Sequence, residues 1–140
     1  MMNTLRLLAA TSLLTAFAVG CGDGRPTRVP VSGKVLIDGA PLTRGALRFK
    51  PSDGRVATGA IGADGKFELM TYEPGDGVVT GMHTVTVHAS EELSNGSVRW
   101  FVPKKYHHAA TSGLSQSIEE PTDDLVIELT WDGKPGPFVE

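Results

Sequence analysis

Cysteine is nearly absent from this sequence, because Cys21 is the only one. No disulfide can therefore form within the chain, and a folded domain must be held together by burial and backbone pairing. Basic charge is also scarce, with 13 Lys and Arg residues against 16 Asp and Glu residues. The densest basic spot, Lys104-Lys105, is too small for the multiple phosphate contacts that nucleic acids require, so we expect no nucleic-acid partner.

Helical periodicity is missing beyond residue 20, and 17 glycines with 9 prolines oppose helices. Apolar and polar residues alternate instead, which is the pattern of half-buried β-strands. In residues 46–50, for example, Leu47 and Phe49 share one face while Arg48 and Lys50 share the other. The pattern predicts strands over residues 29–38, 46–50, 66–69, 82–89 and 124–131, with weaker candidates over 56–61 and 114–118.

Asx-Gly pairs separate these segments and supply the positive φ that tight turns demand. They are Asp38-Gly39, Asp53-Gly54, Asp64-Gly65, Asp76-Gly77, Asn95-Gly96 and Asp132-Gly133. Asp64-Gly65 is the clearest predicted hairpin, because short β-patterns flank it on both sides. About seven short strands separated by turns predict an all-β sandwich.

The N-terminus has the layout of a secretory signal. Arg6 is followed by an apolar run over residues 7–19, and small residues precede the cysteine in Ala18-Val19-Gly20-Cys21. A transmembrane helix needs about 20 apolar residues, and this run is interrupted by Thr11, Ser12 and Thr15. The segment resembles a bacterial lipoprotein signal peptide that ends in a lipobox.

That resemblance implies that Cys21 carries a diacylglyceryl group and, after cleavage, an N-acyl chain, which together suffice for stable membrane attachment. Gly22 follows directly, in place of the acidic residue that retains some lipoproteins at the inner membrane. We expect a lipid-anchored protein of the cell envelope, at the outer membrane facing the periplasm or the cell surface. The expected divisions are a signal peptide over 1–20, a flexible tether over 21–28, a β-sandwich over 29–132 and a tail over 133–140.

Several stretches in order resemble carboxypeptidase regulatory-like domains, whose fold is similar to transthyretin. They are residues 31–35, Asp38-Gly39-Ala40-Pro41-Leu42, residues 45–49, 63–69 and 83–87. Residues 102–106 and 111–114 look like the C-terminal half of small envelope lipoproteins of this type. The resemblance implies a seven-stranded antiparallel Greek-key β-sandwich that serves as an accessory, adhesive or scaffold module without catalysis.

Catalytic motifs are weak. His88 and Glu91 have the His-x-x-Glu spacing of a carboxypeptidase zinc site, but a third ligand is needed, and we predict no metal. His107 and His108 are expected in a solvated loop, and His83 and His88 on opposite faces of one strand. Neither the terminal Tyr-Arg-Gly-Ser signature of transthyretin-fold hydroxyisourate hydrolases nor a Gly-x-Ser-x-Gly motif is present. We therefore expect no enzyme and no cofactor besides the lipid.

A long loop over residues 91–110 gathers the candidate interaction surface: Trp100, Phe101, Lys104, Lys105 and Tyr106. These residues either close one end of the sandwich or bind an envelope polysaccharide or protein partner. Three functions stay open. The first is a tethered, non-enzymatic binding module, the second is a small hydrolase or metal-dependent enzyme using the histidines, and the third is a self-associating structural component.

Overall fold

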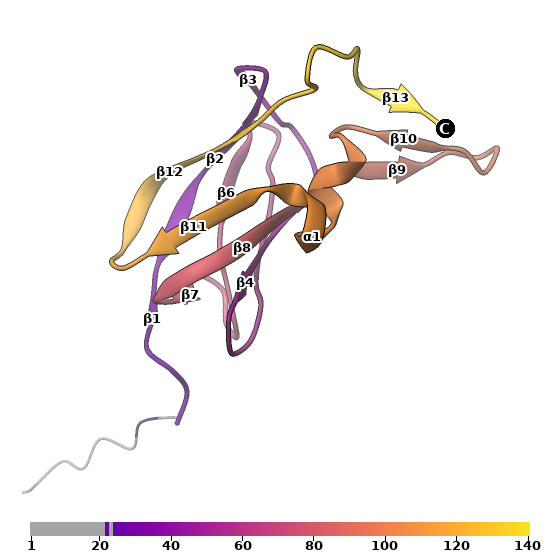
Figure 1. Ribbon diagram of the computed structural model, residues 1–140. Coiled ribbons are helices and arrows are strands. Elements are labelled where there is room, and N and C mark those ends of the chain that lie inside the picture. The colour runs from indigo at the N-terminus through magenta and orange to yellow at the C-terminus, as the bar shows by residue number, and fades with distance from the viewer. Residues whose placement is uncertain (1–21, 23) are drawn as a thin grey trace, which may run out of the picture.

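The computed structural model describes residues 22 and 24–140, so the expected signal peptide and Cys21 lie outside the described residues (Figure 1). The N-terminal strands are β1 (Arg28–Val29), β2 (Val31–Ile37), β3 (Ala40–Pro41), β4 (Ala46–Pro51), β5 (Ala57–Ala60), β6 (Lys66–Glu68), β7 (Val78–Val79) and β8 (Gly81–His88). They are followed by β9 (Ser90–Glu92), β10 (Val98–Trp100), the 3₁₀ helix η1 (Lys104–His107), the helix α1 (Ala109–Ser112), β11 (Leu114–Ile118), β12 (Thr122–Leu129) and β13 (Phe138–Val139). The fold is all-β, as predicted.

Two larger sheets enclose the core. One has the strand order β11-β8-β4-β5, and the other has the order β12-β2-β3 with β6 also paired to β2. Leu47 and Phe49 of β4 are fully buried, whereas Arg48 and Lys50 between and after them are exposed. The predicted alternation is thus confirmed, because successive side chains of a strand point to opposite faces. Inward residues of both sheets form one hydrophobic cluster.

One pairing departs from the expected all-antiparallel arrangement. Strands β2 and β12 run parallel, with Val35 opposite Ile127. Parallel neighbours need a long crossover, and here almost all of the chain between residues 37 and 122 provides it. Gly33 allows the two backbones to approach, because a Cβ at this position would collide with the carbonyl group of Leu125. The contact coincides with a register shift in the pairing between Thr122 and Leu125.

Five of the six Asx-Gly pairs lie in turns or bends, Asp76-Gly77 being the exception, and one of the five has a different role from the one predicted. Asp38 and Gly39 both have positive φ and join β2 to β3 in an antiparallel hairpin. At Asp64-Gly65 the Gly65 N–H donates to the Gly62 carbonyl. The flanking strands, however, pair mainly with other strands, β5 with β4 and β6 with β2. This turn therefore carries the chain from one sheet to the other.

The segment expected as a long loop over residues 91–110 contains regular structure. Strands β9 and β10 form a hairpin, and β13 pairs with the other edge of β10. This three-stranded end sheet projects from the body, at the end of the molecule away from β1 (Figure 1). The expected tail over residues 133–140 thus returns to the fold through β13, while β1 begins at Arg28, the last residue of the expected tether.

Candidate functional site

The predicted interaction surface is gathered around β10 and η1, but its five residues differ in exposure. Lys104 is exposed, Lys105, Trp100 and Phe101 are half-buried, and Tyr106 is only 4% exposed. The ring of Phe101 is covered by Arg44, whose guanidinium carbon lies 4.3 Å from the ring centroid. The surface predicted from sequence is therefore divided between residues that stabilise the fold and residues that ligands can reach.

Tyr106 fixes η1 to the end of β12. Its hydroxyl oxygen accepts the Thr130 N–H at 3.1 Å, and the hydroxyl donates to the Thr130 carbonyl at 3.4 Å. The ring is buried in the hydrophobic cluster. Because Tyr106 lies between Lys105 and His107 in the chain, this contact positions the side chains on both sides of η1.

Three aromatic rings line up between β10 and the C-terminal segment. Trp100 stacks on Phe138 with the ring centroids 6.4 Å apart and an interplanar angle of 16°. Phe138 in turn meets Trp131 at 6.0 Å and 76°, an edge-on contact. Gly136 lies directly against the indole of Trp131, where a Cβ would collide with the ring. These contacts explain why Trp131 is only 8% exposed.

A cleft of about 530 Å³ opens between η1 and this aromatic row. We call it the C-terminal cleft, and its lining residues are Pro103, Lys104, Lys105, Trp131, Asp132, Lys134, Pro135, Phe138 and Glu140. Lys104 pairs with Glu140 and lies 4.9 Å from the centroid of Trp100, and Lys105 Nζ lies 2.5 Å from Asp132 Oδ2. The hydrogen bond to Asp132 raises the pKa of Lys105. The cleft thus has an aromatic floor and walls whose charges are largely balanced by pairing.

The histidines divide between the two faces of β8, as predicted. His83 faces the core, where its ring lies 5.9 Å from that of Phe49, and burial lowers its pKa despite the bond to the Gly81 carbonyl. His88 faces the outside of the sheet, with its ring 4.6 Å from that of His107. The two faces are separated by the sheet, so His83 and His88 cannot act on one ligand.

His107 is not in a solvated loop, contrary to expectation. It belongs to η1, its ring lies 4.8 Å from that of Trp100, and its Nε2 accepts the Ala89 N–H at 3.4 Å. Burial, with the charges of His88 and His108, lowers the pKa of His107 to about 4. Burial also lowers the pKa of His88, with Arg48 and His108 adding to the effect. Both shifts favour the neutral imidazole at pH 7.

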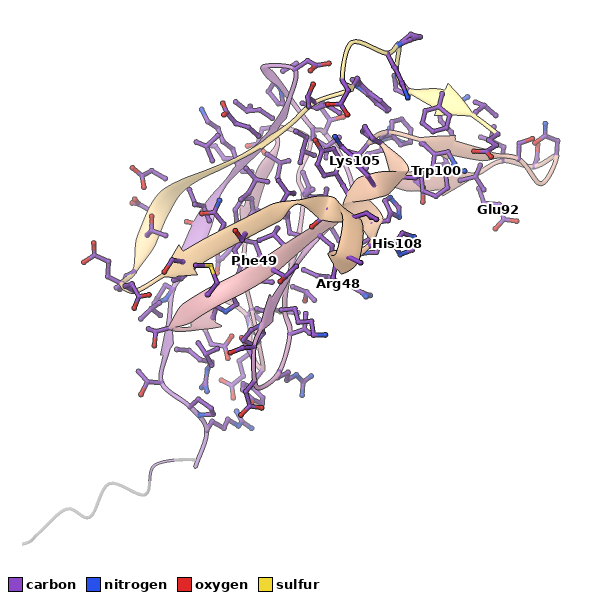
Figure 2. All side chains as sticks on the ribbon, viewed as in Figure 1. Arg48, Phe49, Glu92, Trp100, Lys105 and His108 are labelled. Carbon is purple, nitrogen blue, oxygen red and sulfur yellow. The ribbon has the colours of Figure 1, made fainter. Side chains whose placement is uncertain are left out.

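A second groove, of about 450 Å³, runs beside these rings. We call it the histidine groove, and it is lined by Arg48, Lys50, Val56, Thr58, Thr86, His88, His107, His108 and Ala109. Figure 2 shows Arg48 and His108 on the same side of the molecule, next to α1. Three of the four histidines thus line one groove. Glu91 is engaged elsewhere, at 3.3 Å from Arg99 and 3.6 Å from Arg44.

The described residues do not form a metal site of the kind that the His-x-x-Glu spacing suggests. Within residues 24–140, no group of three or more His, Cys, Asp or Glu side chains is placed to hold a metal ion. None of the helices in the described part of the chain has the length and apolar character that crossing a membrane requires. Comparison with known proteins finds no matching family, no matching curated protein and no matching solved structure.

Sequence reasoning missed several residues of both sites. Phe138 and Glu140 were expected in a tail, yet both line the C-terminal cleft. Trp131, at the end of the strand predicted over residues 124–131, is buried and also borders this cleft, which the strand pattern did not indicate. The aromatic Phe138 within a Pro- and Gly-rich segment is the one sequence signal that could have indicated docking onto the domain. Arg48 was correctly placed on the outer face of β4, but nothing local to its strand indicated that three histidines lie nearby.

Proposed function

We propose that this protein is a lipoprotein of the bacterial cell envelope, anchored through Cys21, that serves as a tethered, non-enzymatic binding module. The lipobox-like sequence over residues 18–21 supports the anchor. The two packed sheets and the Asp38-Gly39 hairpin support a domain of the carboxypeptidase regulatory-like, transthyretin-like type. Gly22 supports placement at the outer membrane.

The observation that carries the binding role is the place of the C-terminal cleft. The chain enters the domain at β1, and the end sheet lies at the other end of the molecule (Figure 1). Phe138 of this sheet lines the cleft. A domain held at its β1 end presents this cleft away from the anchor. Function at the far end of a tethered domain is what an adhesive or scaffold module needs.

The chemistry of the cleft favours an envelope polysaccharide as the ligand. Ligand sites combine apolar and aromatic walls with a few polar groups that fix orientation, and here Trp131 and Phe138 are joined by the ammonium groups of Lys104 and Lys105. Because both lysines are paired with carboxylates, the cleft suits hydroxyl-rich, weakly charged sugars. A protein partner is the alternative ligand, and the experiment must distinguish it from a polysaccharide.

The binding test compares two neighbouring side chains of β13. Phe138 lines the cleft, whereas Val139 is 52% exposed and lies outside it. We expect Cys21→Ala protein to co-sediment with insoluble cell-envelope polysaccharide, Phe138→Ala to lose this binding and Val139→Ala to keep it. Equal binding by both variants, or none by the parent protein, would refute the ligand assignment. If Cys21→Ala protein retained another protein and no polysaccharide, the ligand would be a protein partner and not a polysaccharide.

The anchor is tested separately by fractionating cells that produce the wild type or Cys21→Ala. We expect the wild type in the membrane fraction and Cys21→Ala in the soluble fraction after a high-salt wash. Salt removes electrostatic adhesion by screening but leaves buried acyl chains in place. Membrane retention of Cys21→Ala after that wash would show that the anchor proposal is wrong.

A further inference from the structure

The histidine groove concentrates basic side chains on one patch of the outer sheet face. Register places Arg48 of β4 directly opposite Thr58 of β5 on one side and Thr86 of β8 on the other. Residues opposite one another in a sheet have neighbouring Cβ atoms on the same face. The guanidinium thus stands between two hydroxyl-bearing side chains. His107 and His108, from η1 and the residue after it, border the same groove.

The charge of this patch is not balanced by carboxylates. No Asp or Glu is among the residues that line the groove. In the part of the chain that the structure describes, no carboxylate lies within ion-pair distance of Arg48, Lys50 or His88. This contrasts with the C-terminal cleft, where Lys104 and Lys105 are both paired. An unbalanced set of cations and N–H donors in a concave site attracts anions.

We propose that the histidine groove binds a tetrahedral oxyanion of the phosphate class. Arg48 supplies a planar fork of donors suited to such groups, and Lys50 adds a second permanent charge. The hydroxyl of Thr58 and the imidazoles of His88 and His107 add donors from other sides of the groove. The Thr86 hydroxyl is buried and lies 3.4 Å from Nε2 of His88. Donors on several sides outnumber the two oxygens of a carboxylate and match the four oxygens of phosphate.

The proposal includes a pH dependence with a defined sign. The groups facing His107 are His88 from β8, Trp100 from β10, His108 from the adjacent residue, and the cations Arg48 and Lys50 across the groove. All of the ionisable ones are basic. Burial first, and then the charges of His88 and His108, lower the pKa of His107 in the free groove. A bound anion favours the imidazolium form. Binding therefore takes up protons, and affinity rises as the pH falls.

The test titrates Cys21→Ala protein with inorganic phosphate, sulfate or glycerol phosphate. NMR of the histidine ring protons measures the binding of each probe. Sulfate keeps its charge over the pH range of interest, so its pH dependence reports the protein alone. We expect phosphate and sulfate to shift the His88 and His107 resonances saturably, and sulfate to bind more tightly at lower pH. Tighter binding of glycerol phosphate than of inorganic phosphate would identify a phosphate ester as the natural source, and the reverse would identify free phosphate.

The matched variants are Arg48→Gln and Arg99→Gln. Arg99 is also a surface arginine, but it is already paired with Glu91 at 3.3 Å. Loss of a charged hydrogen-bonding group predicts about tenfold weaker binding for Arg48→Gln, with Arg48→Lys intermediate and Arg99→Gln unchanged. Because Arg48 is exposed, the fold should survive, and an unchanged unfolding midpoint verifies this.

Two results would overturn the proposal. One is the absence of saturable shifts beyond those that chloride produces at equal ionic strength. The other is equal affinity of Arg48→Gln and the parent protein for sulfate. The outcome is independent of the polysaccharide test, because that test depends on Phe138 in the C-terminal cleft and this one on Arg48 in the histidine groove.

Discussion

The hydroxyl group of Tyr106 should stabilise the fold through its two hydrogen bonds to Thr130, and their lengths set the expected loss of unfolding free energy. Replacing Tyr106 with Phe removes the acceptor of the Thr130 N–H at 3.1 Å and the donor to the Thr130 carbonyl at 3.4 Å. The second bond is long, so most of the effect belongs to the first. A net hydrogen bond contributes about 1 kcal/mol, and a partly buried N–H left without an acceptor adds to the loss. We therefore expect Tyr106→Phe to lower the free energy of unfolding by about 1–2 kcal/mol.

The ring contributes separately, and a second substitution isolates it. Tyr106 is 4% exposed within the hydrophobic cluster, so Tyr106→Ala leaves a cavity beneath η1. Truncating a buried aromatic ring costs about 3–5 kcal/mol. The chain's other tyrosine provides the control. The structure gives the Tyr72 hydroxyl no hydrogen bond to another described residue, so Tyr72→Phe should leave stability nearly unchanged.

The three variants are made in Cys21→Ala protein and unfolded with urea, and tryptophan fluorescence reports the fraction unfolded. The expected order of stability is Tyr72→Phe close to the parent, then Tyr106→Phe, then Tyr106→Ala. If Tyr106→Phe and Tyr72→Phe proved equally stable, the bridge to Thr130 would contribute nothing. If Tyr106→Phe lowered the stability as much as Tyr106→Ala, the ring would contribute little, and separate contributions of the hydroxyl and the ring would be wrong.

Two further predictions concern pH and backbone packing. Because the folded protein holds the pKa of His107 at about 4 and an unfolded histidine titrates near 6.5, the unfolded state binds its proton first. The free energy of unfolding should therefore fall as the pH drops from about 6.5 to about 4. In chemical unfolding at a series of pH values, His107→Gln should show a smaller decline. An identical decline would contradict the assignment of this pH dependence to His107. Gly33→Ala should destabilise the β2–β12 pairing by more than about 1–3 kcal/mol, since the colliding atoms belong to the Leu125 backbone. Gly62→Ala, where the nearest atom is a side-chain oxygen of Asp64, is its control, and similar unfolding midpoints for the two would contradict that packing argument.

Most of the local structure could be predicted from the sequence, because strand alternation and Asx-Gly turns are local signals. All seven predicted segments contain strands, and Leu47, Phe49, Val85 and Val87 face the core as expected. The direction of β12 relative to β2 is not a local property, since it depends on which strands become neighbours after the whole chain has folded. Alternation reads the same in either direction, so it could not reveal the parallel pair.

The candidate sites were only partly predictable for a related reason. Trp100, Lys104 and Lys105 were singled out because they cluster in sequence. Lys104 and Lys105 of η1 do line one cleft, and Trp100 of β10 stacks on Phe138, which lines the same cleft. Phe138 was missed because a two-residue strand at the end of a Pro- and Gly-rich segment has too few positions to show a period. The His88–His107 contact was missed because the two rings meet only when η1 packs on β8.

The anchor and the C-terminal cleft together constrain how the domain is presented. If Cys21 carries the lipid, residues 22–27 connect it to β1, and a fully extended residue spans at most about 3.6 Å. From Cys21 to Arg28 this tether therefore reaches at most about 25 Å, less than the roughly 30 Å width expected of a domain of this size. The end sheet can meet the anchoring membrane only if the domain lies flat along it. In the upright arrangement the C-terminal cleft points away from the lipid, which is the orientation that the proposed polysaccharide-binding role needs.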